Sequence, residues 1–203
     1  ELAALAYRED LREDVRRAAE QIMARNPERS VATALFHLLY RDPEALPMLE
    51  QLAARYQYDA KMRSHLGHVY AEKRRWFAAA RLFEEATMLG DSHAFEAADQ
   101  YWLAGLFQEA LRMNALAPKS IAQQIQRVAI LFEAHSYARI VAMAPTLTDP
   151  ATIYRVAYSH YAIGDHGRAT DKARALLNTS YREAAISLLH AMGRTETEIR
   201  AQQ

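Results

Sequence analysis

The chain has 203 residues, 51% of them hydrophobic, and its 25 Lys and Arg side chains balance 25 Asp and Glu. This balance gives no global basic field and argues against a nucleic-acid partner. The absence of cysteine excludes disulfides, thiol nucleophiles and thiolate metal sites, and is compatible with both cytosol and periplasm. No apolar run approaches the roughly 18 residues of a membrane-spanning helix, so we expect no membrane segment. Because the chain opens at Glu1 without an initiator Met, we expect it to be a piece of a longer protein.

The N-terminal part predicts a charged helical hairpin. The segment from Asp14 to Asn26, followed by Pro27, is typical of a second helix, and Leu2 to Tyr7 would belong to the first. Acidic and basic side chains alternate here, with Glu13 and Arg17 four residues apart. Such pairs indicate a solvated helix face.

The next two helices are predicted from their ends. Ser30 precedes an apolar run that includes Leu35 to Leu39, so we expect it to cap that helix at its N-terminus. Asp42 and Pro43 would end the first helix and start the second. Pro47 lies only one turn into that second helix, where a missing amide is tolerated.

The stretch from Lys61 to Asp91 predicts a helical hairpin. Two helices of about a dozen residues each fit it, with a turn between Lys73 and Trp76. Glycine inside a helix costs about 1 kcal/mol relative to alanine, so we expect a neighbouring helix to approach Gly67 closely. Ala79 is the expected small contact on the second helix, and Phe83 follows it one turn later on the same face.

This hairpin resembles the tetratricopeptide repeat, whose signature residues occupy fixed places over about 34 residues. Arg63 stands where the family has Trp, and Asp91 where it has Pro, although Gly90 can supply the missing helix stop. The six places that match the signature are Leu66, Gly67, Tyr70, Ala79, Phe83 and Ala86.

The turn of this hairpin recurs along nearly the whole chain. Positions equivalent to its aromatic place are spaced 31, 31, 30, 29 and 29 residues apart. They are Ala45, Trp76, Phe107, Tyr137, His166 and Thr195. The resemblance implies an all-α fold, a right-handed superhelical solenoid of about six antiparallel helical hairpins that forms one domain over residues 1–203. The turns are expected near Pro43, Lys73, Gly105, His135, Gly164 and Gly193.

In this family the first helix of each hairpin lines a concave groove that binds partners. Without help from the family, Tyr154, Tyr158 and Tyr161 follow an i, i+4, i+7 pattern and share one helix face. For these three, packing between hairpins and partner binding both stay open. The places that the resemblance assigns to the groove are Thr33, His37, Tyr40, Ser64, His68, Phe95, Asp99, Trp102, Phe132, Tyr154, Tyr158 and Tyr161.

Candidate catalytic and metal residues have simpler interpretations. His65 and His68 lie three apart on one helix face, but two ligands are too few for a metal site. His160 and His166 flank a Gly-Asp pair that the repeat turn already explains. We therefore expect no enzyme activity, cofactor or metal.

The leading functional hypothesis is a non-catalytic protein–protein interaction scaffold. In its Ala- and Arg-rich style the chain is similar to the periplasmic repeat scaffolds of bacterial exopolysaccharide secretion proteins. That resemblance implies a periplasmic location and a polysaccharide-modifying enzyme as partner. The alternative is a glycan-binding conduit, in which polysaccharide lies along the same aromatic groove.

Overall fold

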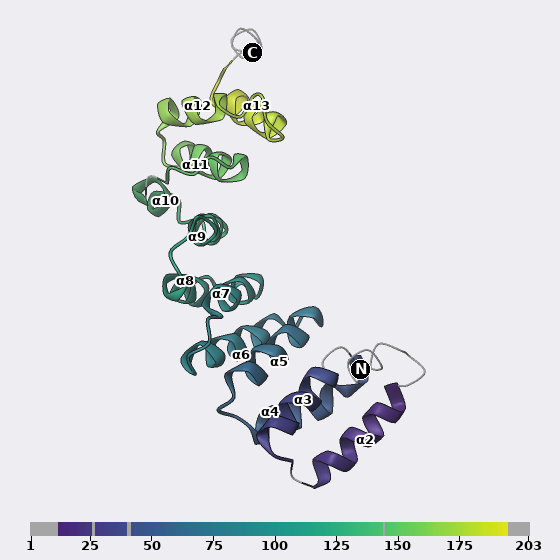
Figure 1. Ribbon diagram of the computed structural model, residues 1–203. Helices are drawn as coiled ribbons and strands as arrows, with labels where there is room; N and C mark the ends of the chain where they lie inside the picture. The colour runs from purple at the N-terminus through teal and green to yellow at the C-terminus, as the bar shows by residue number, and fades with distance from the viewer. Residues whose placement is uncertain (1–11, 26, 40–41, 144, 195–203) are drawn as a thin grey trace. The chain divides into compact units, whose positions relative to one another are not determined.

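The computed structural model describes residues 12–25, 27–39, 42–143 and 145–194. Within these ranges the protein is all-α, with twelve α-helices, one 3-10 helix and no strand (Figure 1). The chain divides into two compact units, unit 1 over Glu1–Leu106 and unit 2 over Phe107–Gln203. In the part of the chain that is described, no helix has the length and apolar character needed to span a membrane.

Unit 1 contains the following helices in chain order: α2 (Arg12–Ala24), α3 (Arg29–Leu39), the 3-10 helix η2 (Pro43–Ala45), α4 (Leu46–Arg55), α5 (Ala60–Glu72), α6 (Trp76–Met88) and α7 (Ala94–Leu103). Unit 2 contains α8 (Phe107–Leu116), α9 (Ile121–Glu133), α10 (Tyr137–Met143), α11 (Pro150–Ala162), α12 (His166–Arg174) and α13 (Arg182–Ala191).

Five of the predicted turns share one backbone geometry. A residue with positive φ follows the helix at Arg74, Gly105, His135, Gly164 and Gly193. The next residue then donates its N–H to the carbonyl five positions back, as Arg75 does to Tyr70 over 2.9 Å. This is the Schellman arrangement, which satisfies carbonyls that the helix end leaves open. The sixth turn, near Pro43, is instead made by η2, with the Asp42 side chain accepting from Glu44 N at 3.0 Å.

The N-terminal predictions hold in part. Helix α2 covers most of the predicted segment, whereas Leu2 to Tyr7 lies outside the described residues. The prediction of Ser30 as an N-cap is wrong, because α3 already begins at Arg29 and Ala32 donates its N–H to the Glu28 carbonyl at 2.9 Å. Ser30 therefore lies in the first turn, where its side chain is exposed.

The core of unit 1 includes the predicted close approach of α5 and α6. A Cβ atom added to Gly67 would lie 3.0 Å from the Phe83 ring, whose atoms are the nearest neighbours. The close approach is thus confirmed, but Phe83 rather than Ala79 fills the space beside Gly67. Phe83 is 1% exposed, so the absent side chain at Gly67 makes room for a fully buried ring.

In unit 2, buried amides join α8 to α9. Asn114 donates to the Gln126 side chain at 2.7 Å and to the Gln123 carbonyl at 2.9 Å, and Gln123 donates back to Asn114. Because buried polar groups are costly without partners, this reciprocal set fixes the register of the two helices. Further along, α11, α12 and α13 share a core around Ala157, Leu176 and Leu189.

Candidate functional site

Four tyrosines of unit 2 form a continuous line of rings: Tyr181, Tyr154, Tyr158 and Tyr161, which we call the tyrosine row. Helix α11 carries the last three, and Tyr181 is the N-cap residue of α13. Successive ring centroids lie 5.7, 6.3 and 5.9 Å apart. The three α11 members recur about once per turn, so the row follows the helix.

The sequence fixes the helix that carries the row. Asp149 caps α11, its side chain accepting from Thr152 N at 2.9 Å, and Pro150 follows at the first helical position. This combination suits a helix start, because the cap satisfies an open N–H and proline has none to satisfy. The start of α11 is therefore fixed one turn before Tyr154.

Two further rings flank Tyr158. Phe132 of α9 lies 5.5 Å from it, and Tyr137, the first residue of α10, lies 5.7 Å from it. Sequence analysis placed Phe132 in the groove but treated Tyr137 only as the aromatic place of a hairpin turn. The hydroxyl of Tyr137 lies 2.8 Å from His135 Nδ1, and burial, with Tyr158 and Glu133 nearby, raises the pKa of Tyr137.

The members of the tyrosine row are half-buried, with one side packed against the core of α11 to α13. None of their four hydroxyls bonds to another residue of the described ranges, and none is among the buried polar atoms that lack a partner. The hydroxyls therefore reach solvent. Burial of the ring, with Tyr158 and Tyr181 close by, raises the pKa of Tyr154, so this hydroxyl stays protonated and able to donate at neutral pH.

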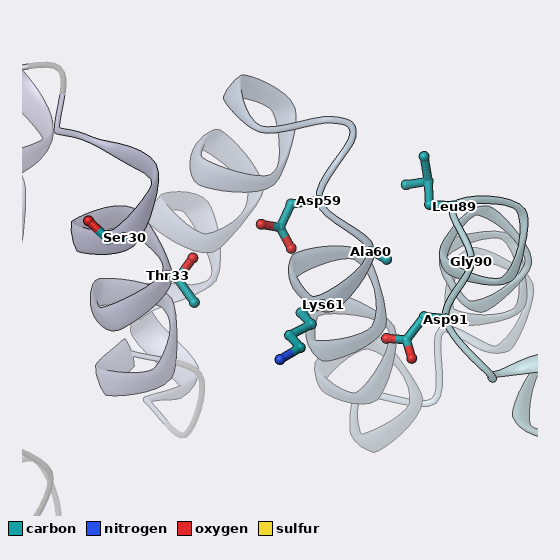
Figure 2. Close-up of a pocket in the computed structure, with 8 residues that line it drawn as sticks. All are labelled: Ser30, Thr33, Asp59, Ala60, Lys61, Leu89, Gly90 and Asp91. Atoms are coloured by element: carbon teal, nitrogen blue, oxygen red, sulfur yellow. The ribbon is translucent and has the colours of Figure 1, made fainter.

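Unit 1 has an open pocket of about 670 Å³ between α3, α5 and the segment after α6 (Figure 2). Asp59 caps α5 by accepting from Met62 N at 3.1 Å, which holds its carboxylate at the pocket wall. The lining offers hydroxyls, two carboxylates and one ammonium group, which suits a polar ligand. It consists of Ser30, Thr33, Asp59, Ala60, Lys61, Leu89, Gly90 and Asp91.

Histidines from three elements of unit 1 lie close together. His37 and His65 have ring centroids 4.6 Å apart, and His68 and His93 are 6.1 Å apart. Burial, reinforced by the neighbouring histidines and Lys61, lowers the pKa of His65. Burial and His93 lower the pKa of His68, against the opposing effect of Glu96 and Glu72.

The groove positions predicted in unit 1 differ in exposure. Thr33 lines the pocket and His37 is exposed, whereas Tyr40 lies outside the described residues. Ser64 is only 4% exposed and donates to the Lys61 carbonyl at 3.1 Å, so Lys61 rather than Ser64 represents α5 in the pocket lining. The remaining positions are His68, which is exposed, and Phe95, Asp99 and Trp102, which are half-buried.

The pair His160 and Asp165 serves the turn between α11 and α12. His160 Nδ1 lies 3.1 Å from Asp165 Oδ2, and Asp165 caps α12 by accepting from Arg168 N at 3.2 Å. That backbone hydrogen bond, together with His160, lowers the pKa of Asp165. Among residues with described positions, no group of three or more His, Cys, Asp or Glu side chains is arranged to hold a metal ion.

Two parts of these sites were missed by sequence reasoning. Tyr181 joins the row from a different helix, and Asp91 joins the pocket from a loop. Neither position has a periodic signal, because each depends on how helices pack rather than on spacing along one helix. For Tyr137, its place three residues before Ile140 on a short helix was the available clue.

No protein-family model matches this sequence, and no curated protein sequence matches it significantly. The resemblance to tetratricopeptide repeats therefore rests on the residues of this chain alone.

Proposed function

We propose that this chain is a non-catalytic, tetratricopeptide-like scaffold that docks a protein partner on its tyrosine row. In this proposal the helical hairpins continue as one right-handed superhelical solenoid. The recurrence of the Schellman turn supports it, since the positive-φ residues at Arg74, Gly105, His135, Gly164 and Gly193 recur every 29 to 31 residues. Such regular repetition is the property that lets hairpins stack on their neighbours.

The observation that carries the docking proposal is the state of the four tyrosines. Their rings are half-buried on a core and therefore already ordered, while their hydroxyls reach solvent without a partner. An ordered ring loses little conformational entropy when a partner arrives, and tyrosine combines apolar area with a polar group. These are the properties of residues that dominate protein interfaces.

The resemblance in style to exopolysaccharide secretion scaffolds suggests the kind of partner. We propose a polysaccharide-modifying enzyme that is held beside the secretion apparatus, in the periplasm. Lack of cysteine is compatible with that compartment.

A glycan-binding conduit is the second candidate function. It is favoured by the same solvent-facing hydroxyls, because sugars present both donors and acceptors that tyrosine can match. The two candidates differ in what the protein retains: a protein band in one case, immobilised polysaccharide in the other.

An affinity capture from the native organism tests the proposal, with the full chain as bait. Tyr158→Ala removes the central ring of the row, and Tyr58→Ala is the matched control, since Tyr58 is 78% exposed and lies in unit 1. We expect a protein band that the control retains and Tyr158→Ala loses, with both variants still folded by circular dichroism. Capture that is equal for both variants would refute docking on the row, and retention on polysaccharide alone would favour the conduit.

A further inference from the structure

We propose that the tyrosine row binds a proline-rich segment in the polyproline II conformation. This inference rests on the proposed docking function and names the chemistry of the docked segment. It follows from three properties of the row: the inclination of its rings, its unpartnered hydroxyls and its low charge.

The rings of the row are inclined to one another. Tyr181 and Tyr154 make an interplanar angle of 37°, Tyr154 and Tyr158 make 43°, and Tyr158 and Tyr161 make 65°. Such a row offers wedge-shaped clefts rather than a flat platform. Clefts between aromatic rings accept the compact pyrrolidine ring of proline, as aromatic-lined grooves do in other polyproline-binding domains. A flat sugar ring is better matched by a coplanar stacking surface.

The hydroxyls of the row select among peptide conformations. Each hydroxyl is a donor without a partner in the described part of the chain. A polyproline II segment has no internal hydrogen bonds, so its carbonyls are free to accept, and proline has no N–H that would need an acceptor. A docked helix would satisfy its own backbone and leave the tyrosine hydroxyls buried without partners, which is unfavourable. An ordinary extended strand would bring N–H groups that the row cannot all satisfy.

The charge of the row agrees with a neutral ligand. Of the thirteen residues of α11, only Arg155 carries a formal charge at neutral pH when histidine is counted as neutral. A partner therefore needs no compensating charge pattern. The three ring-to-ring steps, each close to 6 Å, would be covered by a segment of about six residues at about 3.1 Å per residue.

Fluorescence anisotropy with the full chain tests the inference. The probe is decaproline with a terminal fluorophore, and the matched probe is a glycine–serine peptide of equal length. We expect saturable binding of decaproline and none of the glycine–serine peptide. Tyr158→Phe keeps the ring and removes one hydroxyl, and should weaken decaproline binding about 3- to 10-fold. Tyr58→Phe, outside the row, should leave it unchanged.

Several outcomes would overturn the inference. They are equal binding of both peptides, no saturable decaproline binding at millimolar concentration, or an affinity that Tyr158→Phe leaves unchanged while its thermal transition matches the parent protein. If Tyr158-dependent capture of a partner persists without decaproline binding, the docking function stands and the polyproline assignment is wrong. Displacement of decaproline by a proline-free partner helix at the row would also count against it.

Discussion

At the scale of single residues, Gly67 decides how closely α5 and α6 approach. A methyl group there would meet the Phe83 ring at 3.0 Å, closer than side-chain carbons normally lie. Gly67→Ala should therefore lower the free energy of unfolding by about 1 to 2 kcal/mol, because the overpacking penalty exceeds the gain in helix propensity. Thermal or urea unfolding of the two proteins measures this difference.

Gly167→Ala is the matched control for that experiment. Gly167 lies in the first turn of α12, and an added Cβ there has only Asp165 Oδ1 nearby, at 4.0 Å. This change should be neutral or stabilise the protein by about 0.5 to 1 kcal/mol. If Gly67→Ala behaved like Gly167→Ala, the close approach would not matter to stability.

The histidines of unit 1 predict a pH dependence of stability. The pKa values of His65 and His68 are lowered from 6.5 by burial and by neighbouring histidines. The folded state then binds fewer protons than the unfolded state, so their contribution is fully present above 6.5 and is lost as the pH falls below it. We expect the thermal transition to drop between about pH 7 and pH 5.

The groups that surround these two histidines define the control for the pH experiment. His37, His93 and Lys61 disfavour protonation, whereas Glu72 and Glu96 favour it at His68. The double variant His65→Gln and His68→Gln should flatten the drop, and His190→Gln, an exposed position of unit 2, should not. Carboxylates with lowered pKa values such as Asp165 titrate below 3.8 and do not contribute in this window.

At the scale of helices, the sequence predicts ends better than neighbours. The turn glycines Gly105, Gly164 and Gly193 each adopt positive φ, which only a residue without Cβ does at no cost, so their signal is local and strong. His135 and Arg74 adopt the same geometry without being glycine. Their turns were predictable only because the 30-residue spacing extended the pattern to them.

Packing between helices was less predictable, because it depends on rotation about the helix axis. Ser64 was assigned to the groove by spacing alone, yet it is 4% exposed, while its neighbour one turn earlier, Lys61, lines the pocket. A rotation of one position is enough to exchange a buried face for an open one. Tyr181 shows the same limit, since it reaches the row from the N-cap of another helix.

The contact between α5 and α6 predicts the effect of a core truncation. Phe83 is 1% exposed and lies beside Gly67, with the His68 ring 4.8 Å away. Phe83→Ala should leave a cavity and cost about 3 to 5 kcal/mol. Denaturant unfolding measures the loss, and an unchanged midpoint would show that this ring does not support the fold.

At the scale of the whole molecule, the two units have separate cores. The core of unit 1 includes Phe36, Leu49 and Leu66, and that of unit 2 includes Leu176 and Leu189. In repeat proteins stability is a sum of local terms and nearest-neighbour interfaces, so separate units can unfold at different denaturant concentrations. This property can be measured directly, because both tryptophans, Trp76 and Trp102, belong to unit 1.

Tryptophan fluorescence therefore reports on unit 1, whereas circular dichroism reports on the helices of both units. Leu189→Ala truncates a side chain that is 1% exposed in unit 2 and should cost that unit about 2 to 5 kcal/mol. We expect its circular dichroism transition to broaden or split toward lower urea, while the fluorescence midpoint stays with the parent protein. Phe83→Ala, in unit 1, should move the fluorescence midpoint itself. Coincident transitions that shift equally in both variants would mean that the units unfold as one cooperative body, because a loss in either core would then be shared by the whole array.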